Sequence, residues 1–174
     1  MADSDFEVVA NYIADNYLID IAKKLNDQVL IDSLVQFKNT SKESTAPDFY
    51  LDEQNNQKKL SDLAGFEYYA LVFWSSSCSH CLNEIPQLES FVKTLKENEL
   101  QVIAIGLEND DKAWSEAIKN YPDFIHVLGL GKWDNEIGNL YDIKATPTYF
   151  VLDKNKHIVA KPTDIETLKA FFEI

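Results

Sequence analysis

The chain has 174 residues, which fits one ordinary domain with a short extension, and 45% of the residues are hydrophobic, as in a globular protein with a real core. Its net charge is −13 at pH 7 and all 16 basic residues are lysines. We expect no nucleic-acid partner, because an acidic surface repels a polyanion and bidentate recognition of phosphate or guanine normally uses arginine. The longest apolar runs, such as the one from Val102 to Leu107, are too short to cross a membrane.

The first 40 residues carry apolar side chains at helical spacing, and we expect two or three short helices at about 5–24 and 27–38. The polar, proline-containing stretch KNTSKESTAP comes next and predicts a linker at 41–47. The sequence therefore predicts a helical extension at 1–40 and a second unit at 48–174. The extension either caps that unit or is the tail of a larger upstream region.

From Ala46 onward, strand and helix patterns alternate. The segments DFYLD and QKKLSDL predict a short strand pair. A buried strand is expected at 68–74, then a helix from Ser79 to about Asn98, and a second buried strand at 100–108. The expected elements after these are a helix in DDKAWSEAIKNY, a short strand in FIHVLGL, a helix in NEIGNLYDI, a hairpin turning at 153–155 and a last helix in DIETLKAFFEI. This order predicts an α/β fold with a central mixed sheet covered by helices on both faces.

The only two cysteines, Cys78 and Cys81, lie three residues apart where a helix is expected to follow the 68–74 strand. A disulfide that closes so short a loop restricts the unfolded chain very little, so a structural role is a poor explanation for the pair. Cys78 falls in the first helical turn, where free N–H groups and the helix dipole stabilise a thiolate. We therefore predict a redox-active pair that needs no other cofactor, with Cys78 as nucleophile and Cys81 as resolving thiol.

Two neighbours of the pair are candidates for tuning it. A protonated His80 would stabilise the thiolate of Cys78 and make the disulfide more oxidising, although His80 is equally well explained as a solvent-facing residue of the loop. Glu84 lies in the apolar arc of the same helix, one turn beyond Cys81. We expect it to be partly buried and to exchange a proton with the resolving thiol. The alternatives for Glu84 are an outward orientation or an ion pair with His80.

The segment ATPTYF supplies a further candidate, Pro147, at the start of a predicted strand. A proline there leaves the strand edge open because it has no N–H. If the Thr146–Pro147 bond is cis, the backbone of Thr146 faces the cysteines and can pair with an extended substrate. Most X–Pro bonds are trans, so the residues alone leave the isomer open.

Four motifs in this order resemble the thioredoxin superfamily, and specifically its TlpA/ResA-like bacterial thiol-disulfide oxidoreductases: APDFYL, LSDLAGFEYYALVFW, CSHCLNEIPQL and YDIKATPTYFVLD. The resemblance covers residues 46–174. It implies a thioredoxin-like fold, in which Cys78 attacks, Cys81 resolves, Pro147 is cis and Glu84 lies near the site. It also implies protein thiol and disulfide substrates, an upstream electron donor, and a place in the periplasm or cell envelope.

The chain departs from that family pattern just before the first cysteine. Ser77 stands where these proteins usually have a tryptophan before the first cysteine, and Trp74 remains at the end of the strand. The site is therefore expected to be more open and polar, so substrate preference and redox potential do not carry over.

The acidic residues that follow Met1 do not fit a signal peptide. An envelope location thus requires an export signal that this sequence lacks, and the alternative is the cytoplasm.

Two other functions fit parts of the pattern. A thiol peroxidase also uses a nucleophilic cysteine, but it normally has a threonine three residues earlier and a basic residue, whereas this chain has Ser75 there and no arginine. A copper or zinc carrier could use Cys78, His80 and Cys81, with His126 or His157 as a fourth ligand. His80 projects about 100° away from Cys81 on a helix, so this arrangement requires the helix to unwind. The sequence sets neither the direction of electron flow nor the oligomeric state.

Overall fold

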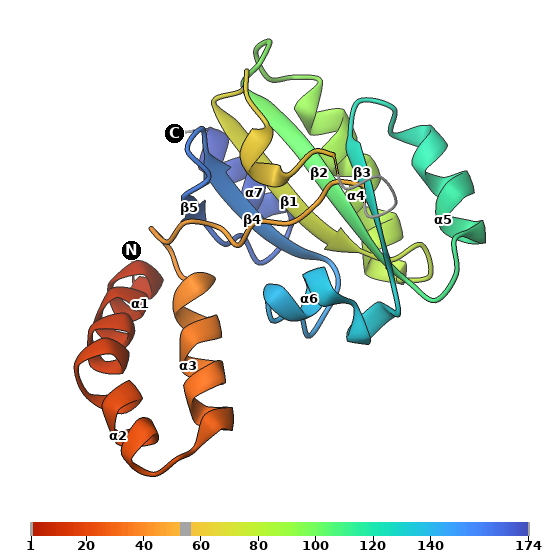
Figure 1. Ribbon diagram of the computed structural model, residues 1–174. Helices are drawn as coiled ribbons and strands as arrows, with labels where there is room; N and C mark the ends of the chain where they lie inside the picture. The colour runs from red at the N-terminus through yellow and green to blue at the C-terminus, as the bar shows by residue number, and fades with distance from the viewer. Residues whose placement is uncertain (1, 53–56, 174) are drawn as a thin grey trace.

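The structure is a computed structural model that describes residues 2–52 and 57–173 (Figure 1). Its first part is helical, as predicted. Helix α1 (Ala2–Ile13) continues through a π-helical stretch (Ala14–Leu18) into α2 (Ile19–Lys24), and α3 (Gln28–Asn39) packs back against α2. The carboxylate of Asp27 caps α3 by accepting the N–H of Leu30 at 3.0 Å.

The rest of the chain forms a five-stranded mixed sheet in the order β3-β2-β1-β4-β5 (Figure 1). The strands are β1 (Tyr68–Trp74), β2 (Leu100–Glu108), β3 (Ile125–Leu130), β4 (Thr148–Asp153) and β5 (Ile158–Ala160). The central strand β1 pairs in parallel with β2 and antiparallel with β4. The helices are α4 (Ser79–Val92), α5 (Lys112–Ala117), α6 (Glu136–Leu140) and α7 (Ile165–Phe172), with single 3₁₀ turns at Leu60–Asp62, Ile118–Asn120 and Lys132–Asp134.

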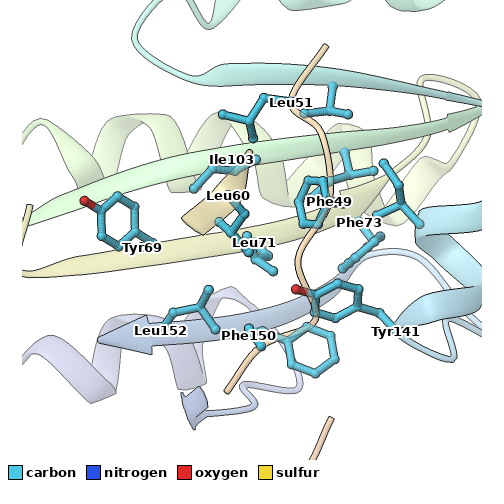
Figure 2. Close-up of a cluster of buried hydrophobic side chains, with 14 of the residues drawn as sticks. Phe49, Leu51, Leu60, Tyr69, Leu71, Phe73, Ile103, Tyr141, Phe150 and Leu152 are labelled. Atoms are coloured by element: carbon cyan, nitrogen blue, oxygen red, sulfur yellow. The ribbon is translucent and has the colours of Figure 1, made fainter. Parts of the chain in front are cut away.

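Side chains of β1 alternate between the two faces of the sheet, as the strand period requires. Tyr69, Leu71 and Phe73 enter one buried cluster, which Figure 2 shows together with side chains from the 46–63 segment and the end of α6. In this cluster Phe73 and Tyr141 are ring neighbours at 5.2 Å between centroids. Each large apolar side chain fully buried in such a cluster contributes about 1.5–3 kcal/mol through the hydrophobic effect.

The opposite face of the sheet is covered by α4 and α7, whose inward residues join a second buried cluster. Trp74 and Cys81 belong to this second cluster, so the cysteine-bearing helix packs directly on the face of β1. Helices therefore cover both faces, and the predicted fold class is confirmed. Within the described residues, no helix is long and apolar enough to cross a membrane.

The segment 41–47, which we predicted as a linker, is hydrogen-bonded to the edge of the sheet. The N–H of Glu43 donates to the oxygen of Ile158 at 2.7 Å, and the N–H of Ile158 donates to the oxygen of Ser44 at 2.9 Å. Glu7 on α1 also reaches this edge, because its carboxylate accepts from the N–H of Lys42 at 2.8 Å. The helical extension is thus tied to the sheet by specific contacts.

Two expected elements differ from those observed. Helix α4, which contains Cys81, ends at Val92 rather than near Asn98, and Asn98 has a positive φ of 61°, which a right-handed helix residue does not adopt. The strand pair expected from DFYLD and QKKLSDL is reduced, in the described residues, to one isolated bridge between Tyr50 and Lys59. Phe49 and Leu51 are buried on the face of the sheet, so the segment serves mainly to cover the core.

Candidate active site

The loop 75–78 leads from β1 into α4 and places Cys78 at the N-cap of that helix. The sulfur of Cys78 accepts the N–H of Cys81 at 3.4 Å, as a capping side chain does. The same sulfur lies 3.3 Å from the main-chain oxygen of Thr146, to which the thiol donates. The Thr146–Pro147 peptide bond is cis, as the resemblance implied. The fold thus brings Cys78, Cys81, Thr146 and Pro147 together.

The two thiols, both free in this structure, differ in exposure and in acidity. Cys78 is partly exposed, whereas Cys81 is completely buried. Burial disfavours the thiolate of Cys78, but hydrogen bonds from the Cys81 thiol and from the main-chain N–H groups of Cys81 and His80 outweigh it, so the pKa of Cys78 is lowered from 9.0. Burial, followed by the hydrogen bond to Cys78, raises the pKa of Cys81 to about 12. This asymmetry suits a reactive first cysteine and a protected second one.

Glu84 is partly buried, as expected, and it points into the protein. One of its oxygens, Oε2, accepts the phenol of Tyr149 at 2.9 Å and the N–H of Ile165 at 3.0 Å. Tyr149 lies on β4 and Ile165 is the first residue of α7, so the carboxylate joins three elements. The outward orientation and the ion pair with His80, which were the alternatives at this position, do not describe this geometry.

A second buried carboxylate, Glu108 at the end of β2, lies against the loop before Cys78. It is 5% exposed, and its Oε2 accepts the hydroxyl of Ser75 at 3.3 Å while its Oε1 accepts the N–H of Ser76. The hydroxyl of Ser75 also accepts the N–H of Ser77 at 3.3 Å. Sequence reasoning missed Glu108; the only available signal was an acidic residue that ends an apolar strand.

The remaining candidates lie around the pair. Ser77 is exposed and its hydroxyl is 3.0 Å from that of Ser75, so the position usually held by tryptophan is polar and open. The side chain of His80 is exposed as well. Trp74 is 1% exposed and packs against Tyr121, with ring centroids 6.3 Å apart.

The two histidines considered as a fourth ligand in the metal-carrier alternative have other partners. Across residues 2–52 and 57–173, no group of three or more His, Cys, Asp or Glu side chains could hold a metal ion. His126 lies in β3, where its Nε2 is 2.8 Å from the oxygen of Tyr121. His157 lies next to β5, where its Nδ1 is 3.3 Å from a carboxylate oxygen of Asp153.

Comparison with known proteins identifies related sequences. The AhpC/TSA family profile matches residues 43–161. The thiol-disulfide oxidoreductase ResA of Bacillus subtilis is 29% identical over 129 residues, which are 73% of this chain and 70% of that protein. ResA of Bacillus cereus is 29% identical over 117 residues, which are 67% of this chain and 66% of that protein.

Solved structures give the same picture. A domain of a possible thiol-disulfide isomerase from Cytophaga hutchinsonii is 32% identical, with a TM-score of 0.63, and the match covers 75% of this chain and 90% of that one. The thioredoxin domain of a thiol-disulfide oxidoreductase from Bacteroides vulgatus is 26% identical, with a TM-score of 0.63, and the match covers 76% of this chain and 96% of that one. These likenesses confirm the predicted thioredoxin-like fold.

Proposed function

This chain belongs to the AhpC/TSA family and is a thiol-disulfide oxidoreductase of thioredoxin-like fold, and we propose that it exchanges disulfides with protein substrates through Cys78 and Cys81. The observation that carries the proposal is the difference between the two thiols. Cys78 is accessible at a helix start with a lowered pKa, whereas Cys81 is buried with a raised pKa. Such a pair reacts with a partner at one sulfur only.

The reductive direction proceeds in two displacements. The Cys78 thiolate attacks one sulfur of the substrate disulfide, that disulfide breaks, and its other sulfur leaves as a thiolate that takes up a proton. Cys81 then loses its proton, and its thiolate attacks Cys78. A disulfide forms between Cys78 and Cys81, and the second substrate sulfur leaves as a thiol. Two electrons and two protons from an upstream dithiol donor regenerate the enzyme.

The second displacement needs a proton acceptor, because Cys81 holds its proton at neutral pH. Glu84 stands one turn beyond Cys81 on the same helix and faces the interior, where Tyr149 and Ile165 bind one of its oxygens. Its other oxygen is then available as the acceptor. Glu84 is accordingly the proposed general base of the resolution step.

A substrate chain docks, in this proposal, beside Thr146 and Pro147. Both residues are half-buried at the rim of the site, and exposed Ser77 lies at the approach to Cys78. An extended peptide can pair with the backbone of Thr146, as strands pair in a sheet. The proposed setting is the periplasm or cell envelope, as the family resemblance implies.

Trapping of a mixed disulfide tests this function. The Cys81→Ser variant, mixed with a disulfide-containing protein, should accumulate a stable mixed disulfide at Cys78, located by mass spectrometry. The Cys78→Ser variant is the control and should trap nothing. A mixed disulfide on Cys81 instead, or none on either cysteine, would refute the proposal.

A parallel assay addresses the thiol peroxidase alternative. Hydrogen peroxide should oxidise wild-type Cys78 no faster than it oxidises a simple thiol of similar pKa. The hydroxyl of Ser75 is already held by Glu108, and the chain has no arginine to bind peroxide. A rate several orders of magnitude higher would instead assign the cysteine to peroxide chemistry.

A further inference from the structure

We propose that Tyr149 is a positioning residue that acts through Glu84 to promote the resolution step. The inference rests on the proposed function, because it concerns the step in which Cys81 closes the disulfide. Tyr149 lies on β4, two residues after Pro147, and is 1% exposed. Its hydroxyl donates to Oε2 of Glu84 at 2.9 Å.

A second donor fixes the same oxygen from another side. The N–H of Ile165, at the start of α7, donates to Oε2 of Glu84 at 3.0 Å. Asp164 caps α7 by accepting the N–H of Thr167 at 2.8 Å, so the direction of the Ile165 N–H is itself fixed. Two donors from two elements therefore hold one oxygen of the carboxylate.

Within residues 2–52 and 57–173, both hydrogen bonds to the Glu84 carboxylate are made at Oε2, and its other oxygen, Oε1, has no hydrogen-bond partner. Glu84 follows Cys81 by three residues on α4, a spacing that puts the two side chains on the same face of the helix. Because two hydrogen-bond donors occupy Oε2, Oε1 is the oxygen left to accept the thiol proton. Without the hydroxyl of Tyr149, the Glu84 carboxylate keeps only its hydrogen bond from the N–H of Ile165 and can rotate away from Cys81.

The environment of Tyr149 keeps it a donor. The groups that act on it electrostatically come from the surrounding elements: Cys81 and Glu84 on α4, and Asp164 at the N-cap of α7. Burial first, then the hydrogen bond to Glu84 and these negative charges, raise the pKa of Tyr149 above its ordinary value. The phenol therefore stays protonated over the working pH range and does not itself accept the proton of Cys81.

The step that Tyr149 supports begins from the mixed disulfide between Cys78 and the substrate. Cys81 gives its proton to Glu84 and attacks the sulfur of Cys78. The bond from Cys78 to the substrate sulfur breaks, and the substrate thiolate takes up one proton. Tyr149 touches neither sulfur in this account and works only by orienting Glu84.

The test compares two phenylalanine variants by stopped flow with a model disulfide, followed by acid quenching and mass analysis. Tyr149→Phe keeps the ring and removes the donor. It should slow resolution by about tenfold, which corresponds to the loss of one hydrogen bond to a charged group, and should leave attack by Cys78 at the wild-type rate. The mixed disulfide then accumulates transiently.

Tyr69→Phe is the matched control. Tyr69 is also 1% exposed and lies in the same sheet, but it faces the opposite cluster, and its hydroxyl has no partner among the described residues. This variant should resolve at the wild-type rate. Equal slowing in both variants, or an equal loss of Cys78 attack in Tyr149→Phe, would mean that the ring only supports packing, and would overturn the inference.

Glu84→Gln completes the design. If Tyr149 acts through Glu84, the double variant Tyr149→Phe/Glu84→Gln should resolve no more slowly than Glu84→Gln alone. Multiplicative slowing would overturn the inference, as would a wild-type resolution rate and pH profile in Tyr149→Phe. Multiplicative slowing, or wild-type behaviour of Tyr149→Phe, would leave the proposed function intact. The proposed function is refuted by a different result, namely that Cys81→Ser traps no mixed disulfide at Cys78.

Discussion

The sulfur of Cys78 lies 3.3 Å from the main-chain oxygen of Thr146, a contact that joins residues 68 positions apart in the chain. The thiol must donate in this contact, because a carbonyl oxygen only accepts. Ionisation of Cys78 removes the shared proton, while the N–H groups of His80 and Cys81 remain to stabilise the sulfur. In the proposed function, the thiolate form of Cys78 therefore leaves the main-chain oxygen of Thr146 free to accept an N–H from a substrate backbone.

Alkylation of the reduced protein should distinguish the two cysteines. We expect Cys78 to react first, with a rate midpoint below pH 9, because its pKa is lowered from 9.0. Cys81 should stay unmodified at pH 8 until the protein is unfolded, because its pKa is raised to about 12. Peptide mapping after timed reaction with iodoacetamide measures both rates. Cys81→Ala should raise the Cys78 midpoint by removing the thiol that donates to it; faster labelling of Cys81 in the wild type contradicts the assignment.

Substitution at His80 separates its side chain from its backbone. The imidazole is exposed and well screened by water, so His80→Ala should leave the reduction potential within ~10 mV of wild type. His80→Pro also removes the N–H that stabilises the Cys78 thiolate and should lower the potential by roughly 30 mV for each tenfold loss of that stabilisation. Equilibration in glutathione buffers gives both values. An equal lowering of the reduction potential in both variants would assign the effect to the imidazole, as the sequence alone predicts.

Removal of the Glu108 carboxylate should loosen the loop before Cys78. In Glu108→Ala, the hydroxyl of Ser75 and the N–H of Ser76 lose their buried acceptor, and we expect a loss of about 2–4 kcal/mol in the free energy of unfolding. Glu108→Gln is the control; its amide oxygen still accepts one of these bonds, so the loss should be less than half as large. Urea denaturation of the reduced proteins compares them. Wild-type stability in Glu108→Ala would show that the contacts contribute nothing to stability.

His126 should contribute to acid sensitivity. Burial lowers its pKa below 6.5, so the folded state binds a proton less readily than the unfolded chain does. Its contribution to stability is therefore complete above pH 6.5 and is lost as the pH falls from there through the lower folded value. In His126→Gln, the stability curve should be flatter in this window, as measured by urea midpoints at pH 4.5 to 7.5. An unchanged slope would assign the acid sensitivity to other groups.

The sequence predicted the order of elements after β1 well, because buried strands and amphipathic helices carry strong periodic signals. The prediction failed where buried apolar residues lie outside regular helices and strands. Leu95 prolongs the apolar spacing of α4, although the helix already ends at Val92. Phe49 and Leu51 alternate like a strand, although they only cover the core.

In the candidate site, too, local patterns were predictable from the sequence and long-range contacts were not. Cys78, Cys81 and Pro147 are marked by local motifs, and the structure brings them together. The partners of the two carboxylates lie far away in the chain: Tyr149 is 65 residues from Glu84, and Glu108 is 33 residues from Ser75. Which of these side chains meet depends on the register of β1 with β2 and β4, and no local pattern encodes that register.

The hydrogen bond from the N–H of Ile165 to Glu84 joins residues 81 positions apart, so it can form only late in the synthesis of the chain. A ribosome delivers both cysteines long before it delivers α7. The nascent chain therefore holds an accessible dithiol at a time when Glu84 lacks the donor that α7 supplies. An oxidant that reacts with the chain at this stage meets a thiol pair whose proposed proton acceptor is not yet held in place. In the proposed mechanism, resolution by Cys81 should thus reach its full rate only after α7 has docked, so the docking of α7 sets when the disulfide can close efficiently.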